Sequence, residues 1–214
     1  VTSGAMGVGR GKLGVGAQPA QVPQRQAVAA VGQCELMFMY DKFFGEYNHT
    51  VAQVLLTRDV VKNPIRKKNT INTFQALIKM GIIPVVNEND SVATDELAGD
   101  KFGDNDTLSA IVATLVEADL LLILTDIDGL YDKNPRVAPD AKRIPTVRAI
   151  TDAIRGRAGG AGSARGTGGM ATKVSAAEIA NGAGIPCVVM SGADPNQLYQ
   201  LFDGVVMGTT FLPA

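Results

Sequence analysis

Short apolar segments that end in polar residues recur along this chain, and they restrict its fold more than any other feature. Three of them, each with the polar residues that follow, are 82–86 with 87–90, 120–124 with 125–126, and 185–190 with 191–192. Glycine or aspartate precedes each segment. Runs of this kind are typical of strands that are buried on both faces of a parallel sheet.

Apolar residues at helical spacing occupy the stretches beside these segments. The spacing predicts amphipathic helices over 26–44, from Ile71 to before Gly81, and over 108–116. Helices that alternate with buried strands predict an α/β fold, here a three-layer α/β/α sandwich with a mostly parallel central sheet. No convincing domain boundary interrupts residues 1–214, so we expect one domain.

Charge, hydropathy and cysteine content exclude several classes of protein. Lys and Arg number 20 against 21 Asp and Glu, which leaves no positive excess for binding a nucleic acid. The apolar runs are far shorter than the roughly 20 residues of a membrane helix, so we expect a soluble protein without a membrane partner. Cys34 and Cys187 lie in apolar sequence without a CxxC motif, which favours reduced thiols and a cytoplasmic location.

A glycine-rich stretch precedes one of the expected helices. Seven of the fourteen residues 156–169 are glycine, so this segment should be mobile without ligand. Residues 166–173 combine glycines, a helix start and Lys173, and backbone N–H groups in such an arrangement can bind phosphate. A flexible linker before a capped helix would have the same composition.

Residues 9–14 match the dinucleotide-binding pattern G-x-G-x-x-G. The residues that follow, 15–19, do not open a helix, so the context that this motif requires is absent. A G-x-x-x-x-G-K-[ST] loop does not occur in the sequence either. We therefore do not expect dinucleotide binding at residues 9–14.

Acidic residues gather where strands should end and helices should begin. Asp104 and Asp106 bracket Asn105 before a helix, where one of them could serve simply as an N-cap. Together with Asp90 and Asp126 they exceed what capping needs, and they suit orienting an ammonium group or a hydrated Mg²⁺.

Covalent catalysis finds no support among the nucleophilic residues. The single histidine, His49, lies in a polar stretch, which favours a solvent-facing turn over a catalytic base. The sequence offers neither a Ser/His/Asp set nor a Cys/His pair.

Several strings together resemble those of the glutamate 5-kinases in the amino-acid kinase family. They occur in the family's order over nearly the whole chain. In one-letter code the strings are VTSGA at 1–5, PVVNEND at 84–90, GDND at 103–106, LTD at 124–126 with Gly-Leu-Tyr at 129–131, and GTGGM at 166–170 through Lys173. The resemblance implies ATP-dependent phosphorylation of the γ-carboxylate of L-glutamate to L-glutamyl 5-phosphate, the first step of proline biosynthesis. The kinase half of a delta-1-pyrroline-5-carboxylate synthase is similar.

The resemblance also implies roles for individual residues. Ser3, Asp90 and Asn105 would contact glutamate, and Thr125 and Asp126 would contact the nucleotide. Lys173 would stabilise the transferred charge, and Asp106 would hold the catalytic lysines in place. A loop closing over the phosphates of ATP would comprise Thr167, Gly168, Gly169, Met170, Ala171, Thr172 and Lys173. Mg²⁺ is implied as a cofactor, but no residue is assigned as its direct ligand.

The family pattern sets expectations for the chain ends, regulation and assembly. Family members carry a second lysine on a Gly-rich first strand and loop, which this sequence lacks, so we expect an N-terminally truncated domain that is inactive or unstable alone. We expect no appended PUA domain of the kind that many bacterial relatives carry. Feedback inhibition by proline and a homo-oligomer, a dimer or tetramer, are implied as well.

Two alternatives keep the fold and change the function. Relatives phosphorylate aspartate, N-acetylglutamate, carbamate or UMP, although the strings at 87–90 and 103–106 favour glutamate. A non-catalytic binder of nucleotide or amino acid is the alternative from another class of protein.

Overall fold

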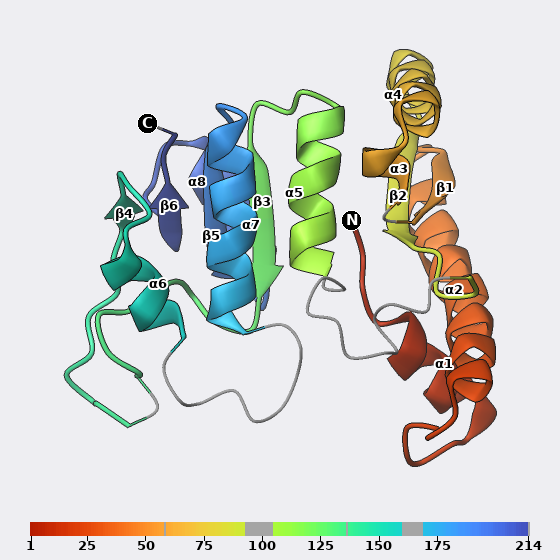
Figure 1. Cartoon of the computed structure of the whole chain (residues 1–214), viewed down its shortest axis with the longest axis horizontal. Coiled ribbons are helices and arrows are strands. Elements are labelled where there is room, and N and C mark those ends of the chain that lie inside the picture. Colours follow the sequence, from red (N-terminus) through yellow and green to blue (C-terminus); the bar gives the residue numbers. More distant parts are fainter. Residues whose placement is uncertain (58, 93–104, 136, 160–168, 214) are drawn as a thin grey trace. The chain divides into compact units, whose positions relative to one another are not determined.

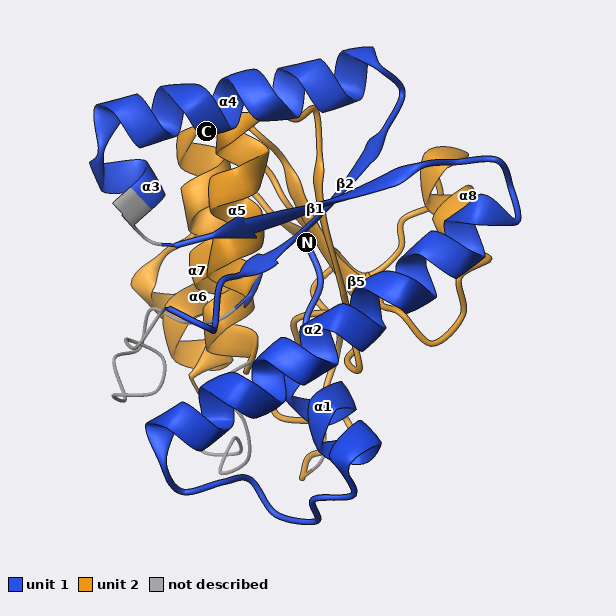
Figure 2. Cartoon of the chain, turned by 90° about the vertical axis from the view of Figure 1, so that its right-hand side faces the viewer, with its two compact units in different colours: residues 1–105 blue, residues 106–214 orange. Residues whose placement is uncertain are grey.

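The computed structural model describes residues 1–57, 59–92, 105–135, 137–159 and 169–213, which form two compact units (Figures 1 and 2). The units are Val1–Asn105 and Asp106–Ala214. The first holds α1 (Ala5–Leu13), α2 (Val22–Gly45), β1 (Val51–Leu56), α3 (Asp59–Lys62), α4 (Pro64–Lys79) and β2 (Ile83–Glu88). The second holds all but the first residue of α5 (Asn105–Leu115), then β3 (Leu121–Thr125), β4 (Thr146–Val147), α6 (Asp152–Ala158), α7 (Met170–Gly182), β5 (Cys187–Ser191), α8 (Gln197–Phe202) and β6 (Thr209–Phe211).

The first unit is built on the parallel pair β1 and β2, which runs in register from Val51 opposite Ile83 to Leu56 opposite Glu88. Val85 and Val86 are buried at the centre of β2. The backbone N–H of Thr2 donates to the Val86 carbonyl at 2.9 Å. This bond places the first residues of the chain beside the carboxyl end of β2. Residues 1–3 make this contact without belonging to a strand.

Helices α1 and α2 approach each other at two glycines. A Cβ placed on Gly32 would lie 1.7 Å from the Ala5 carbonyl oxygen, and one on Gly9 would lie 2.0 Å from the Val28 carbonyl oxygen. Only residues without a side chain allow the two backbones to come this close.

This packing explains the G-x-G-x-x-G string without a nucleotide. Gly9 lies at the helix contact, and Gly14 ends α1 in the left-handed conformation with φ 65°. Its N–H donates to the carbonyls of Arg10 and Gly11, as is common for glycine at a helix end. The expectation that these glycines do not form a dinucleotide site is consistent with these structural roles.

The second unit contains a four-stranded sheet in the order β3-β5-β6-β4. β3 pairs with β5 in parallel, β4 with β6 in parallel, and β5 with β6 antiparallel. Helices α5 and α7 supply small residues to its core, and Ala110, Ala176 and Ala180 are fully buried. The α/β class with parallel-rich sheets is confirmed, and each described sheet belongs to one unit.

One helix boundary is corrected by the structure. The helix expected from Ile71 begins earlier, at Pro64, because Asn63 caps it by accepting hydrogen bonds from the N–H groups of Ile65 and Arg66. Proline is favoured at the first helical position, where its missing N–H costs no hydrogen bond. Cys34 is exposed, whereas Cys187 is buried. Gly156 belongs to α6, while most of the glycine-rich stretch lies outside the described residues.

No helix in the described ranges combines the length and the apolar character needed to cross a membrane.

The close contact between α1 and α2 predicts opposite effects on stability when alanine replaces a glycine inside the contact and a glycine outside it. Gly32→Ala should destabilise the protein by about 2 kcal/mol or more, because the added methyl group meets backbone atoms that cannot move alone. Gly7→Ala should stabilise α1 by about 0.5–1 kcal/mol, since nothing lies within 4 Å of a Cβ there. Urea unfolding of both variants measures the two free energies, and equal values would contradict the packing described.

Candidate functional site

In the second unit, helix starts and strand ends gather at one edge of the sheet. Figure 1 shows that β3 points toward the same end of this unit at which α5 and α7 begin. Thr125 and Ser191 end the parallel pair β3 and β5 opposite each other. The N–H of Gly192 then donates to the Thr125 carbonyl at 2.8 Å. Ligands of open α/β sheets bind at such edges.

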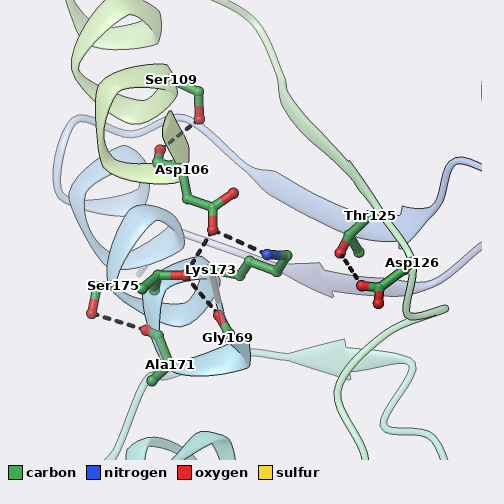
Figure 3. A network of polar contacts seen from close by, with 9 residues as sticks. Asp106, Ser109, Thr125, Asp126, Gly169, Ala171, Lys173 and Ser175 are labelled. Carbon is green, nitrogen blue, oxygen red and sulfur yellow. Dashed lines mark hydrogen bonds and ion pairs between the residues drawn. The ribbon is translucent and has the colours of Figure 1, made fainter. Parts of the chain in front are cut away.

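An ion pair joins the two helices that begin there. Lys173 Nζ lies 3.1 Å from Asp106 Oδ2, and the two side chains are only 6% and 16% exposed. Figure 3 shows them pointing toward each other from α7 and α5. A lysine this deeply buried needs a charged partner, because an uncompensated ammonium group is costly to remove from water.

Further hydrogen bonds hold Asp106 in place, at its carboxylate from α7 and at its backbone carbonyl from α5. The Thr172 hydroxyl lies 2.7 Å from the same Asp106 Oδ2 and 2.6 Å from the Gly169 carbonyl oxygen. The Ser109 hydroxyl donates to the Asp106 carbonyl at 2.6 Å. Asp106 thus links α5 to the first turn of α7 through Lys173 and Thr172.

The sequence of α7 explains how a lysine reaches this position. Lys173, Ala177 and Ala180 are spaced along one face of the helix, and all three are buried. Side chains in a helix lean toward its N-terminus, so the charged end of Lys173 lies near the start of α7, where it meets Asp106. Helix α7 begins at Met170, and its N-cap Gly169 provides no side-chain cap.

The turn after β3 carries two further predicted residues. Asp126 is exposed and Thr125 is half-buried, and the Thr125 hydroxyl donates to Asp126 Oδ1 at 3.1 Å. Thr209, which is completely buried, accepts a hydrogen bond from the Leu130 N–H at 2.8 Å and donates to the Ile144 carbonyl at 2.7 Å. Thr209 therefore anchors this turn, and sequence analysis missed it because it lies 79 positions from Leu130.

The first unit holds the residues expected to contact glutamate. Ser3 is exposed and directly follows Thr2, which is buried and accepts a hydrogen bond from the Tyr40 hydroxyl at 2.9 Å. Asp90 lies in the turn after β2, where burial raises the pKa of its carboxyl above the usual value. Asn105 is the first residue of α5 and the last of this unit.

Two buried amides beside these residues were not assigned a role from the sequence. Asn87 at the end of β2 is 2% exposed, and its Nδ2 donates to Gln33 Oε1 of α2 at 2.9 Å. The signal was available for Asn87, which opens the polar string 87–90. Nothing in the periodicity of α2 distinguished Gln33 from a surface glutamine.

The other predicted site residues either fall outside the described residues or lie at the start of α7. Thr167, Gly168 and Asp104 lie outside the described residues. Gly169 and Met170 are half-buried at the start of α7, and Ala171 is exposed.

Thiol and imidazole chemistry have little support in the described residues. Burial raises the pKa of the Cys187 thiol to about 12, with a contribution from the charge of Asp106, so this thiol stays protonated at neutral pH. His49 is exposed after α2, in agreement with the expected solvent-facing position. Neither group is poised as a nucleophile or base.

Known proteins resemble this chain in sequence over almost its whole length. Residues 1–191 match the Amino acid kinase family. A protein of Clostridium perfringens named glutamate 5-kinase is 55% identical over 99% of this chain and 79% of its own length. A glutamate 5-kinase of Geobacter sulfurreducens is 50% identical over all of this chain and 56% of its own length.

Solved structures share the fold at much lower identity. The UMP kinase of Ureaplasma parvum has a TM-score of 0.59 at 13% identity, covering 95% of this chain and 75% of its own. An isopentenyl phosphate kinase has a TM-score of 0.59 at 15% identity, covering 95% and 78% of the two chains. Agreement of the family match, the sequence identity and the fold shows that this chain belongs to the amino acid kinase family.

Proposed function

We propose that this protein, as its full-length gene product, transfers the γ-phosphoryl group of ATP to the γ-carboxylate of L-glutamate. The products are L-glutamyl 5-phosphate and ADP, and the reaction would open proline biosynthesis in the cytoplasm. The observation that carries the proposal is identity of 50–55% along the whole chain to proteins named glutamate 5-kinase. The buried Asp106–Lys173 pair at the sheet edge supports it.

The acceptor in this reaction needs no general base. A glutamate side chain has a pKa near 4.3, so it is ionised at neutral pH. One of its oxygens forms a bond to the γ-phosphorus while the bond to the ADP oxygen breaks. Catalysis then rests on positioning and on neutralising charge, which is consistent with the absence of a histidine base.

Lys173 is proposed as the catalytic residue that stabilises the charge on the transferred group. Its ammonium group lies in the first turn of α7, where the helix dipole adds partial positive charge. The uncapped N–H groups of that turn, with the loop through Thr167 and Gly168, are proposed to bind the phosphates. Thr125 and Asp126 are proposed to contact the nucleotide.

Asp106 is proposed as a positioning residue that acts through Lys173. Its carboxylate holds the lysine and the Thr172 hydroxyl at the helix start. Lysine side chains are flexible, so such a partner reduces the entropy that ordering would cost in the transition state.

The amino-acid site is proposed to involve Ser3, Asp90 and Asn105. The exposed hydroxyl of Ser3 and the carboxylate of Asp90 offer a donor and an anion, which suit a carboxylate and an ammonium group of glutamate. Burial raises the pKa of Asp90, because its carboxylate loses part of its hydration there. A bound ammonium group would compensate that loss of solvation.

Mg²⁺ is proposed to accompany the nucleotide. In the described ranges, no three His, Cys, Asp or Glu side chains are close enough to form a metal cluster. Mg²⁺ in phosphoryl-transfer sites is commonly bound by one or two carboxylates, with phosphate and water as its other ligands. A site with few aspartates, as proposed here, is therefore compatible with Mg²⁺. Bound Mg²⁺ would supply further neutralisation of phosphate charge.

Assembly and regulation are proposed from the family pattern. A homo-oligomer, either dimer or tetramer, is favoured by the exposed aromatic residues of α2, where Phe38 is 62% and Phe43 is 55% exposed. Proline is proposed as a feedback inhibitor at the amino-acid site.

The reaction is tested by trapping its product as a hydroxamate. The full-length gene product with L-glutamate, MgATP and hydroxylamine should form γ-glutamyl hydroxamate. Lys173→Met should lower kcat by about 10²–10³, because a charge-stabilising donor is lost. Lys79→Met at the exposed end of α4 is the control and should keep full activity. A substrate panel of aspartate, N-acetylglutamate, carbamate and UMP tests other acceptors, and preference for one of these would contradict the proposal.

Asp106→Asn tests the positioning role. The variant keeps hydrogen-bonding atoms but leaves Lys173 without its ion-pair partner, so kcat should fall by about ten-fold or more. Asp106→Glu should recover part of this loss, because the charge returns. Unchanged kcat in Asp106→Asn with normal melting temperature would show that the pair is not needed for turnover.

Asp90→Asn tests a trade between stability and binding. Burial raises the pKa of Asp90 in the folded state, so the folded protein binds the Asp90 proton more tightly than the unfolded chain does. This difference stabilises the fold fully below the unfolded-state pKa, and the stabilisation is lost as pH rises through the folded-state pKa. A neutral asparagine does not lose this stabilisation, so Asp90→Asn should melt at a higher temperature than the unaltered protein at pH 7. The difference between the two melting temperatures should become smaller as the pH falls to about 4. Its affinity for L-glutamate, measured by calorimetry, should fall. A lower melting temperature at pH 7 would contradict the burial cost.

A further inference from the structure

A buried glutamine on α2 carries polar atoms that the fold does not require. Gln33 is 8% exposed and lies on the face of α2 that also buries Ala29 and Leu36. A leucine or methionine at this position could pack against the same neighbours without desolvating an amide. The presence of glutamine therefore calls for a role of its amide group.

One half of that amide has a structural partner and the other has none. Oε1 accepts from Asn87 Nδ2 at 2.9 Å, and Asn87 Oδ1 accepts in turn from the Glu88 N–H at 2.9 Å. The Nε2 group of Gln33 is buried, and among the described residues it finds no hydrogen-bond acceptor. Buried donors without acceptors are rare in folded proteins because they lose hydration without replacement.

The place of Gln33 in the first unit connects it with the proposed amino-acid site. Its partner Asn87 is the second-last residue of β2 and lies three positions before Asp90. Val86, next to Asn87, accepts the backbone hydrogen bond of Thr2, which directly precedes Ser3. Tyr40, seven positions after Gln33 on the same helix, donates its hydroxyl to Thr2. One face of α2 thus contacts both segments that carry the proposed acceptor-binding residues.

Another buried amide in the described chain lacks these connections. Asn181 Oδ1 also has no partner, but it lies in the last turn of α7, where Nδ2 donates to the Leu212 carbonyl. It is therefore at the opposite end of α7 from Lys173. Among the described amides, Gln33 is the one that combines a buried donor without an acceptor with a hydrogen bond to the segment that carries Asp90.

We propose that Gln33 is a specificity-determining residue of the amino-acid site, whose Nε2 group donates a hydrogen bond to a carboxylate of bound L-glutamate. Its Oε1 atom meanwhile fixes the orientation of Asn87. A carboxylate suits this donor because it accepts strong, charge-assisted hydrogen bonds. The inference rests on the function proposed above and adds a residue from α2 to the acceptor site.

Two substitutions separate the donor from the rest of the side chain. Gln33→Glu keeps an oxygen for Asn87 but replaces the donor with a second acceptor, and Gln33→Met removes the amide with little change in volume. Gln24→Glu makes the same change of charge at an exposed position of α2 and is the matched control. All are made in the full-length gene product and assayed at pH 8, where a glutamate side chain is ionised.

The expected result is selective loss of amino-acid binding. Gln33→Glu and Gln33→Met should raise KM for L-glutamate by about ten-fold or more, which matches the loss of one charge-assisted hydrogen bond. KM for ATP should stay unchanged, as should every constant of Gln24→Glu. Calorimetric titration with L-glutamate gives the same comparison without turnover.

Other outcomes overturn the inference and can be told apart from failure of the proposed function. Unchanged affinity for L-glutamate in Gln33→Glu would show that Nε2 serves an ordered water molecule. Equal changes in both KM values with a lower melting temperature would show a purely structural role. Absence of L-glutamate turnover in the unaltered protein would instead contradict the proposed function itself.

Discussion

The ion pair between Asp106 and Lys173 is the interaction on which the second unit's functional edge depends. The Lys173 side chain is only 6% exposed, and a buried charge of this kind is costly without a paired opposite charge such as the Asp106 carboxylate. The same carboxylate receives the Thr172 hydroxyl, so the first turn of α7 is held against α5. Breaking the pair would leave a buried charge and release the helix start together, which couples the stability of this edge to its proposed chemistry.

Polar groups that cost folding free energy gather around the proposed substrate positions in the first unit. Burial raises the pKa of Asp90, and Gln33 keeps an amide donor without an acceptor in the described structure. The close approach of α1 and α2 at Gly32 lies next to Gln33 in the sequence. Proteins commonly retain such local costs where a ligand repays them, and stability elsewhere makes them tolerable.

Much of the fold was predictable from the sequence, whereas the site was predictable only in part. Apolar runs ending at Val86, Leu124 and Met190 marked β2, β3 and β5 correctly because strands buried on both faces leave a continuous pattern. The start of α4 was misplaced because the cap at Asn63 was overlooked. The roles of Ser3, Asp90 and Asn105 toward a substrate remain predictions, as do those of the nucleotide-binding residues.

The sequence by itself determined the α/β class, the positions of the strands and the family resemblance, because these depend on local periodicity and on strings of neighbouring residues. Tertiary structure alone decided that Lys173 meets Asp106, that Thr209 anchors the turn before Leu130, and that Gln33 reaches Asn87. These partners are 54 to 79 positions apart. Contacts over such distances leave no periodic signal in one sequence, since they arise only when separate elements pack together.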